Sequence, residues 1–268
     1  MFGPGTLSLD TIPTLLRQGG IGEQQTLIGG LYSIYLDGAS DRIQGNALTD
    51  TWLKVMGPSR SFSLSFDIKV LELPMTVTFS GTSTDYFWIH LNADADLTVS
   101  RYNGGIVYNH VWETLITTTQ GWQNITLTSD GSNTNRTWKC YIRGIDRGAE
   151  SSITPGPSLT DSRPSGVKFV IGNFLGLADY DFYIDRLMSW EDELSETEAV
   201  EISTANGYYI DVRVDQGNYT SSDTLETFYA MEEGSGTTIS DISGNGNADL
   251  TIINGTANVW STSTLLNP

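Results

Sequence analysis

The sequence predicts an all-β fold, an antiparallel β-sandwich of the jelly-roll type with one short helix near residues 196–203 and an extended N-terminal arm. Charged residues make up only 17% of the chain, while serine, threonine, asparagine and glycine, which favour turns, are abundant. Short segments of alternating apolar and polar residues recur at close spacing, as they do in sandwiches. A length of 268 residues suits one large sandwich, or one domain with extensions.

The clearest strand signal lies in residues 121–144, GWQNITLTSDGSNTNRTWKCYIRG. Ile125 and Leu127 alternate with threonines before a cluster of turn formers at residues 129–133. The alternation then resumes with three apolar residues on one face: Trp138, Cys140 and Ile142. A period of two on both sides of a turn predicts a half-buried antiparallel hairpin.

The same alternation predicts strands before and after this hairpin. They fall at residues 31–37, 62–68, 76–79, 86–91, 94–100, 105–108, 167–172, 182–190, 225–231 and 248–260. Asn103-Gly104 is a typical hairpin turn, so the strands on its two sides are expected to pair.

The one convincing helix signal is SETEAVEIS, which begins at Ser195. Ser195 and Glu198 have the S-x-x-E spacing of a capping box, in which the two residues satisfy free backbone amides at the helix start. Glu196 and Glu198 also suit the positive end of the helix dipole. Asn206-Gly207 is expected to end the helix.

Residues 1–29 differ from the rest, because glycines and prolines interrupt their short apolar groups and leave no core of their own. The segment could be a floppy tail, but it is too apolar for a purely solvated leader. We therefore expect an ordered arm that contacts a partner through its apolar residues: Leu7, Leu9, Ile12, Leu15 and Leu16.

Residues 30–205 are expected to form the sandwich, and residues 206–268 to add acidic C-terminal strands. From Leu187 onward, the chain has fourteen acidic residues and a single basic one, Arg213. Unpaired strands would leave an exposed edge, which proteins avoid. The C-terminal strands should therefore complete the same sandwich, or that of a neighbouring subunit.

Charge and composition disfavour several classes of protein. A formal net charge of −18 repels nucleic acid phosphates. No apolar run reaches the length of a membrane helix, so no membrane insertion is expected. The start of the chain lacks a secretory pattern, which indicates synthesis in a cytoplasm without that export route. Cys140 is the single cysteine, so no intrachain disulfide forms, and its place on an inward face indicates a small buried residue.

Three motifs together resemble the concanavalin A-like lectin/glucanase superfamily, specifically its laminin G-like or pentraxin-like jelly rolls. They are YSIYLDGASDRI at residues 32–43, the hairpin at residues 121–144, and FYIDRLMSWEDELSETEAVEI at residues 182–202. One departure is that EEGSGTTISDISGNGN, at residues 232–247, resembles the segment that usually opens this domain. A circular permutation would explain its late position, and so would a partial second module that packs on a neighbouring subunit.

The overall pattern also resembles structural proteins of tailed bacteriophages. This resemblance implies a non-enzymatic virion protein, either a capsid decoration protein or a head or tail fibre, attached by its arm to other virion proteins. It would be made in the host cytoplasm, lie on the virion surface and form homo-oligomers. The alternative is an adhesin that recognises host glycans, and a remote alternative is a glycoside hydrolase. Fold alone does not decide between them.

No catalytic residue is predicted. Glucanases of this superfamily use closely spaced carboxylates on one strand. The nearest candidates lie in a turn and the first turn of the helix, where a solvated cap explains them: Glu191, Asp192, Glu193, Glu196 and Glu198. The two histidines, His90 and His110, have ordinary strand-like surroundings and do not form a Ser-His-Asp set.

Two binding sites are candidates. Oxygen-bearing residues alternate around Gly246 in a pattern similar to a calcium loop, although Ile252 replaces the expected glutamate; they are Asp241, Ser243, Asn245, Asn247 and Asp249. The alternative is a turn capped by its own side chains.

A sugar site is predicted at a cluster of aromatic and amide residues: Tyr102, Asn103, Tyr108, His110 and Trp112. Four other tryptophans are expected in the core: Trp88, Trp122, Trp138 and Trp190.

Overall fold

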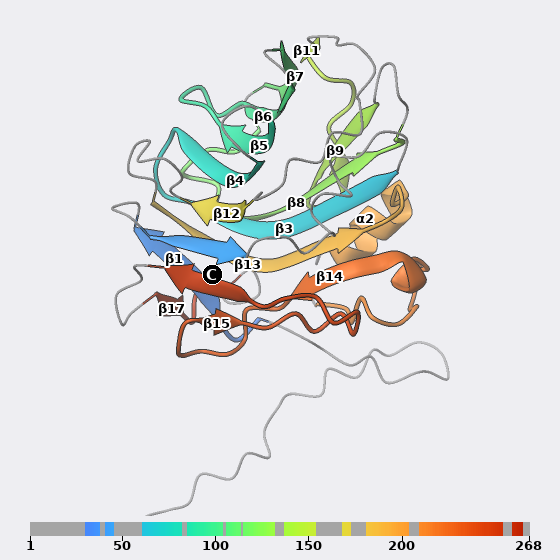
Figure 1. The fold of residues 1–268 in the computed structure, drawn as a ribbon. Coiled ribbons are helices and arrows are strands. Elements are labelled where there is room, and N and C mark those ends of the chain that lie inside the picture. The colour runs from blue at the N-terminus through green and yellow to red at the C-terminus, as the bar shows by residue number, and fades with distance from the viewer. Residues whose placement is uncertain are drawn as a thin grey trace, which may run out of the picture.

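The computed structural model describes residues 30–37, 41–45, 61–81, 85–103, 106–113, 115–131, 137–153, 168–172, 181–203, 209–253 and 259–264. Two antiparallel sheets pack face to face, and a short helix covers one of them (Figure 1). The predicted all-β class is therefore confirmed. The predicted N-terminal arm, with its five apolar contact residues, lies outside the described residues.

The first sheet has eight strands, and β13 pairs with β14 in addition to its neighbours in the main order. That order is β10 (Ile145–Asp146), β9 (Trp138–Ile142), β8 (Trp122–Ser129), β3 (Phe62–Val70), β13 (Asp181–Trp190), β1 (Ser33–Asp37) and β17 (Trp260–Ser261), with β14 at Leu225–Tyr229.

The second sheet has nine strands. Their order is β11 (Ser152–Ile153), β7 (Ile106–Trp112), β6 (Leu97–Asn103), β5 (Asp85–Leu91), β4 (Met75–Gly81), β12 (Lys168–Gly172), β2 (Arg42–Gly45), β16 (Leu250–Ile253) and β15 (Thr238–Ile239). The hairpin predicted around Asn103-Gly104 is confirmed, because Asn103 of β6 pairs with Ile106 of β7.

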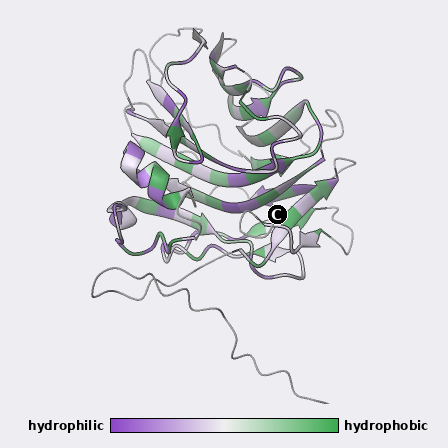
Figure 2. Ribbon diagram, turned by 180° about the vertical axis from the view of Figure 1, so that it is seen from behind, coloured by the Kyte–Doolittle hydropathy of each residue, from purple (hydrophilic) through white to green (hydrophobic). Residues whose placement is uncertain are grey.

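Alternating side chains of both sheets fill the core between them, and Figure 2 shows the matching change of hydropathy along the strands. The hairpin predicted at residues 121–144 is confirmed as β8 and β9, with Leu127 opposite Cys140 and both side chains fully buried. Trp138 lies edge-on to Phe62 (ring centroids 5.1 Å apart) and stacks with Phe87 (5.9 Å). One end of the core is therefore aromatic.

The predicted helix is α2 (Glu196–Ile202), and its capping box is confirmed. The Glu198 amide donates to Ser195 Oγ (3.3 Å), and the Ser195 amide donates to Glu198 Oε2 (2.9 Å). The predicted end at residues 206–207 is wrong. The helix ends at Ile202, because the backbone N–H (3.3 Å) and the hydroxyl (2.8 Å) of Ser203 both donate to the Val200 carbonyl.

The C-terminal strands pair with strands of this same chain in both sheets. β14 pairs with β13, β16 with β2, and β17 with β1. On one side of β13, β1 pairs with residues 181–184, and β14 pairs with residues 187–190. Arg186 lies between these two partners at a β-bulge, with a positive φ of 40°.

An outer layer, which we define as α2 together with residues 209–224, covers the face of the eight-stranded sheet that points away from the core (Figure 1). The 3-10 helix η1 (Ser222–Thr224) ends this layer. The apolar residues between the outer layer and the sheet form a second cluster: Met188, Trp190, Leu194, Ile202, Ile210, Val212, Tyr219, Leu225, Phe228 and Ala230. Within the described parts of the chain, no helix has the length and apolar character needed to cross a membrane.

Candidate functional site

The outer face of the nine-stranded sheet carries a group of polar and aromatic side chains. On β5, Phe87, Ile89 and Leu91 belong to the core, so Trp88 and His90 between them lie on the opposite face. The sequence prediction that placed Trp88 in the core is therefore wrong, and its side chain is only half-buried.

The two neighbouring strands extend this group across the face. On β6, the core residues Leu97 and Val99 leave Thr98 and Ser100 on the outer face. The strand register places Ser100 between Trp88 of β5 and Asn109 of β7. We call Trp88, His90, Thr98, Ser100 and Asn109 the outer-face cluster.

Two aromatic rings of the outer-face cluster are in contact. The ring centroids of Trp88 and His90 lie 4.3 Å apart, with 31° between the ring planes. Burial lowers the pKa of His90 below its ordinary value, so the imidazole is neutral at neutral pH. A neutral imidazole offers one donor nitrogen and one acceptor nitrogen to a ligand.

Two buried polar atoms of the outer-face cluster have no hydrogen-bond partner: His90 Nδ1 and Asn109 Oδ1. Leaving such an atom unpaired costs about 1–3 kcal/mol, so native proteins rarely do so without a reason. The two residues belong to strands on either side of β6 and are offset by two residues along the strand direction, which places their backbones about 12 Å apart. Thr98 and Ser100 are buried as well, so a ligand with several hydroxyl groups can bond both atoms only when the groups that cover this face move aside.

The residues predicted to bind sugar do not form one surface. Tyr102 and Asn103 lie on β6 and Tyr108 lies on β7, but their side chains are outside what the structure describes. Trp112 faces the core and is only 2% exposed, with its indole N–H directed at the Gly148 carbonyl (3.4 Å). Its ring is therefore not exposed for stacking on a sugar.

His110 also faces inward, where its Nδ1 lies 2.8 Å from Glu150 Oε1 and both side chains are largely buried. The alternation Phe-Trp-Ile-His-Leu at residues 87–91 is the signal that identifies Trp88 and His90 as the outward residues of β5.

The predicted calcium loop is closed by its own hydrogen bonds. Asp241 accepts from the Phe228 amide (2.8 Å) and from the Ser243 hydroxyl (2.7 Å). The side-chain amides of Asn245 and Asn247 donate to carbonyl groups of β14, at 2.6 Å in each case. Asp249 Oδ1 accepts from the Asp241 amide (3.2 Å), and the described residues contain no cluster of His, Cys, Asp and Glu arranged for a metal. These contacts are those of a capped turn that covers the free edge of β14.

The acidic stretch around the helix start also has structural partners. Glu193 pairs with Lys139 (2.7 Å), and Glu198 accepts from the Ser221 hydroxyl (2.6 Å) as well as serving the capping box. Burial acts to raise the pKa of Glu198, but the hydrogen bonds from Ser221 and Ser195 outweigh it and hold that pKa below its ordinary value. Glu198 therefore holds the helix start and the segment around Ser221 together.

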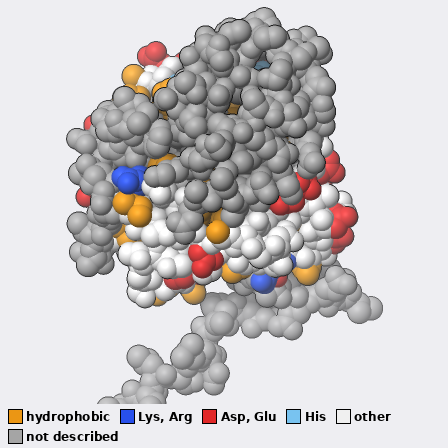
Figure 3. Space-filling model, in the orientation of Figure 1, with side chains coloured by type: hydrophobic (Ala, Val, Ile, Leu, Met, Phe, Trp, Pro, Cys, Tyr) orange, Lys and Arg blue, Asp and Glu red, His pale blue; other side chains and the backbone are white. Residues whose placement is uncertain are grey.

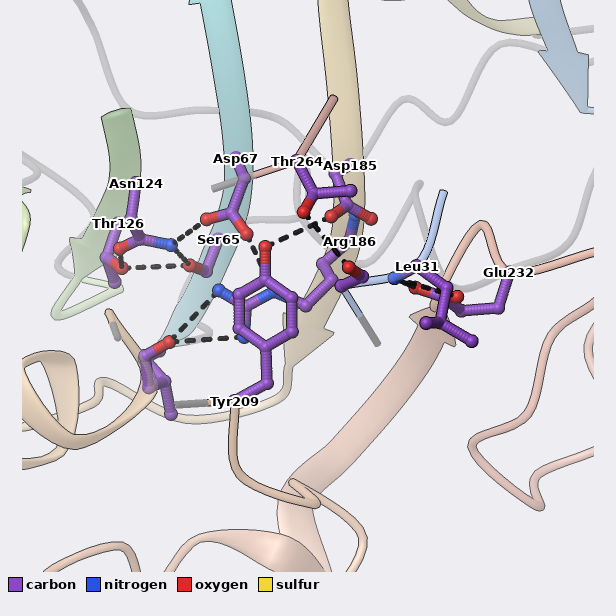
Figure 4. Close-up of polar contacts among 12 residues, drawn as sticks. Leu31, Ser65, Asp67, Asn124, Thr126, Asp185, Arg186, Tyr209, Glu232 and Thr264 are labelled. Carbon is purple, nitrogen blue, oxygen red and sulfur yellow. Dashed lines mark hydrogen bonds and ion pairs between the residues drawn. The ribbon is translucent and has the colours of Figure 1, made fainter. Parts of the chain in front are cut away.

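A second polar group lies on the outer face of the eight-stranded sheet, beneath the outer layer (Figure 4). We call Asp67, Asp185, Arg186 and Tyr209 the buried polar centre, because all four are 0% exposed. Arg186 Nε donates to Asp67 Oδ2 (2.7 Å), and the Tyr209 hydroxyl donates to Asp185 Oδ2 (3.1 Å). No ligand can reach these groups while the outer layer is in place.

A hydrogen-bonded chain of neutral side chains continues from this centre across the sheet (Figure 4). Asn124 Nδ2 donates to Asp67 Oδ1 (2.8 Å) and to Ser65 Oγ (3.1 Å), and Thr126 donates to Asn124 Oδ1 (3.2 Å). Both oxygens of Asp67 are therefore satisfied, one by a cation and one by an amide.

The family model described as the concanavalin A-like lectin/glucanases superfamily matches residues 37–200. This match covers more than half of the chain, so the protein belongs to that superfamily, as the sequence motifs indicated. No curated protein matches the chain.

Solved structures with the same fold are distant in sequence. A Bacteroides ovatus structure, described as that of a candidate carbohydrate-binding protein, is 15% identical, with a TM-score of 0.52 and coverage of 86% of this chain. This chain spans only 59% of that protein's length. A heptameric SAP-like pentraxin of Limulus polyphemus is 15% identical, with a TM-score of 0.47 and coverage of 75% of this chain and 92% of the pentraxin. At these identities, the likeness shows the fold alone.

Proposed function

We propose that this protein is a non-catalytic carbohydrate-binding module whose ligand lies on the outer face of the nine-stranded sheet, at the outer-face cluster. The observation that carries the proposal is the pair of unpaired buried atoms, His90 Nδ1 and Asn109 Oδ1, beside the ring of Trp88. A sugar offers hydroxyl groups for the polar atoms and a C–H face for the ring.

The comparisons support this proposal at the level of fold. The superfamily is described by its lectins and glucanases, and the Bacteroides ovatus structure is described as that of a candidate carbohydrate-binding protein. The location of the ligand rests on the outer-face cluster of this chain.

The carboxylates of the described residues favour binding over hydrolysis. Glycoside hydrolysis uses an acid and a second carboxylate on either side of the bond to be cleaved. The outer-face cluster contains no carboxylate. Asp67 and Asp185 do lie together, but both are 0% exposed beneath the outer layer.

A glycan array with the full chain tests the proposal, followed by titration of the best ligand. We expect Trp88→Ala to weaken binding about tenfold, because an aromatic stack contributes about 1 kcal/mol or more. Trp260→Ala is the matched control, since the indole of Trp260 donates to the Gly236 carbonyl (2.9 Å) at a remote site on β17. Absence of any glycan ligand, or equal binding by the Trp88→Ala variant, would refute the proposal.

Asn109→Leu provides a sharper test, because it separates binding from folding. Replacement of an unpaired buried polar group by an apolar group of similar shape is close to neutral or stabilising. We therefore expect this variant to unfold at the same or a higher denaturant concentration while its affinity for the glycan falls. A loss of stability without loss of affinity would show that Asn109 serves the fold and not the ligand.

We further propose that residues 1–29 attach the module to a phage particle, as part of a homo-oligomer on the virion surface. The apolar residues of this segment favour contact with a partner, and the backbone that follows it is held to the sandwich at two points. The Leu31 amide donates to both oxygens of Glu232 (3.1 and 3.2 Å), and the Thr264 hydroxyl donates to the Gly30 carbonyl (3.0 Å) (Figure 4). Deletion of residues 1–29 should release a folded protein from the particle; retention of the truncated protein would refute an anchoring role.

A further inference from the structure

The buried polar centre joins the outer layer to the eight-stranded sheet. Asp67 comes from β3, Asp185 and Arg186 come from β13, and Tyr209 comes from the outer layer. The guanidinium of Arg186 also donates to the carbonyl of Ile202, at the end of α2, from both terminal nitrogens (3.3 Å each). Its Cζ lies 3.6 Å from the centroid of the Tyr209 ring. Both parts of the outer layer are therefore held by the same few groups.

The charges in this centre do not balance if every group ionises. Two carboxyl groups face one guanidinium, and that guanidinium makes its short contact with Asp67. Asp185 has neutral donors, the Arg186 backbone amide (2.8 Å) and the Tyr209 hydroxyl (3.1 Å). A buried excess charge is costly, and a carboxyl group in this position takes up a proton instead.

The surroundings of Asp185 raise its pKa on balance. Burial, and then the negative charge of Asp67, raise the pKa of Asp185 well above its ordinary value, and Glu232 raises it further. The positive charge of Arg186 and the hydrogen bond from the Tyr209 hydroxyl lower it, but do not offset these effects. Burial also raises the pKa of Tyr209, so that its hydroxyl keeps its proton.

We propose that Asp185 carries a proton in the folded protein at neutral pH, and that its ionisation in alkaline solution opens the outer layer while the two sheets stay folded. An ionised Asp185 competes with Asp67 for the guanidinium of Arg186. That guanidinium also holds the Ile202 carbonyl and the ring of Tyr209, so its displacement loosens α2 and the segment that begins at Tyr209 together.

The direction of the pH effect follows from proton linkage. An exposed aspartate has a pKa of about 3.9, so the opened state loses its proton first as the pH rises. Between that value and the raised pKa of the closed state, the closed state binds one proton more, and the opening constant rises about tenfold per pH unit. The closed outer layer is therefore most stable at acid pH, and it loses this stability as the pH rises toward the pKa of Asp185 in the closed state. Asp185→Asn cannot ionise and removes this dependence.

Hydrogen exchange of the full chain, read by mass spectrometry from about pH 5 to about pH 9, tests the proposal. Peptides from α2 and residues 209–224 report opening, and peptides from β8 and β9 are the internal reference. We expect the ratio of opening constants, wild type over Asp185→Asn, to rise with pH in the outer layer and to stay constant in the reference. A ratio that does not change with pH would overturn the proposal.

Two further measurements test the protonation of Asp185 and its competition with Asp67, even if one variant folds poorly. The wild type at neutral pH should show the infrared band of a protonated carboxyl group, and Asp185→Asn should lack it; absence of the band from the wild type would overturn the proposal. Asp67→Asn is the matched control, because it removes the same charge but leaves Arg186 to pair with Asp185. It should lose the pH dependence and open more at every pH, and an unchanged pH dependence in this variant would contradict the competition for Arg186.

Discussion

Replacement of Arg186 by methionine tests how strongly the buried polar centre holds this fold. Methionine fills much of the same volume and meets the same positive φ of 40°, so the backbone strain at the bulge is similar in both proteins. The charge is lost, however, and Asp67 then lacks the cation that lies 2.7 Å away in the wild type. The Ile202 carbonyl and the ring of Tyr209 lose their contacts with the guanidinium in the same step.

The expected loss of stability is about 3–5 kcal/mol, the usual cost of removing one partner from a buried ion pair. Both side chains of this pair are 0% exposed, which places the loss in that range and not in the range of surface pairs. The total stability of a domain is about 5–15 kcal/mol, so the variant should remain folded but marginal. At about 2–4 °C per kcal/mol, its Tm should fall by about 6–20 °C.

Urea unfolding followed by tryptophan fluorescence measures this loss, and calorimetry measures the Tm. The double variant Asp67→Leu/Arg186→Met is the control, because it leaves no unpaired charge at Asp67 and should recover much of the stability. A loss below about 1 kcal/mol for Arg186→Met, or a double variant no more stable than the single one, would refute the view that an uncompensated carboxylate causes the loss.

Three further predictions concern the helix, a tight contact and the covered strand edge. Ser195→Ala removes half of the capping box and should cost about 1 kcal/mol in urea unfolding; no change would contradict a role for the cap. Gly144→Ala should cost about 1–3 kcal/mol or more, because φ is +73° and the new Cβ would lie 2.6 Å from Val200 Cα; a wild-type Tm would contradict this packing. Asp241→Ala uncovers the edge of β14 and should raise light scattering on mild heating, while EDTA should leave the wild-type Tm unchanged; a fall in Tm with EDTA would indicate a bound cation at this loop.

Local patterns in the sequence predicted the parts of the fold that depend on neighbouring residues. The hairpin of β8 and β9 follows from alternation on both sides of a turn, and the capping box follows from the spacing of Ser195 and Glu198. The short helix near residues 196–203 and the antiparallel strands are confirmed for the same reason. Turn chemistry and periodicity act over a few residues, so they can be recognised without tertiary contacts.

The features that depend on distant residues could not be predicted in this way. Arg186 pairs with Asp67, 119 residues earlier in the chain, and no local pattern marks either residue as a buried charge. The sugar site was predicted at residues that include Trp112, because aromatic residues cluster there. The alternation of side chains along β7 instead places that ring in the core. His90 and Asn109 belong to one outer face only because β6 pairs with both of their strands.

A crystal structure of the full chain with the best ligand from the glycan array tests the proposed sugar site most directly. We expect a sugar over the outer face of β5, β6 and β7, with one hydroxyl bonded to Asn109 Oδ1, another to His90 Nδ1, and a ring beside Trp88. A sugar bound elsewhere on the protein, with His90 and Asn109 still unpaired, would contradict the proposed site.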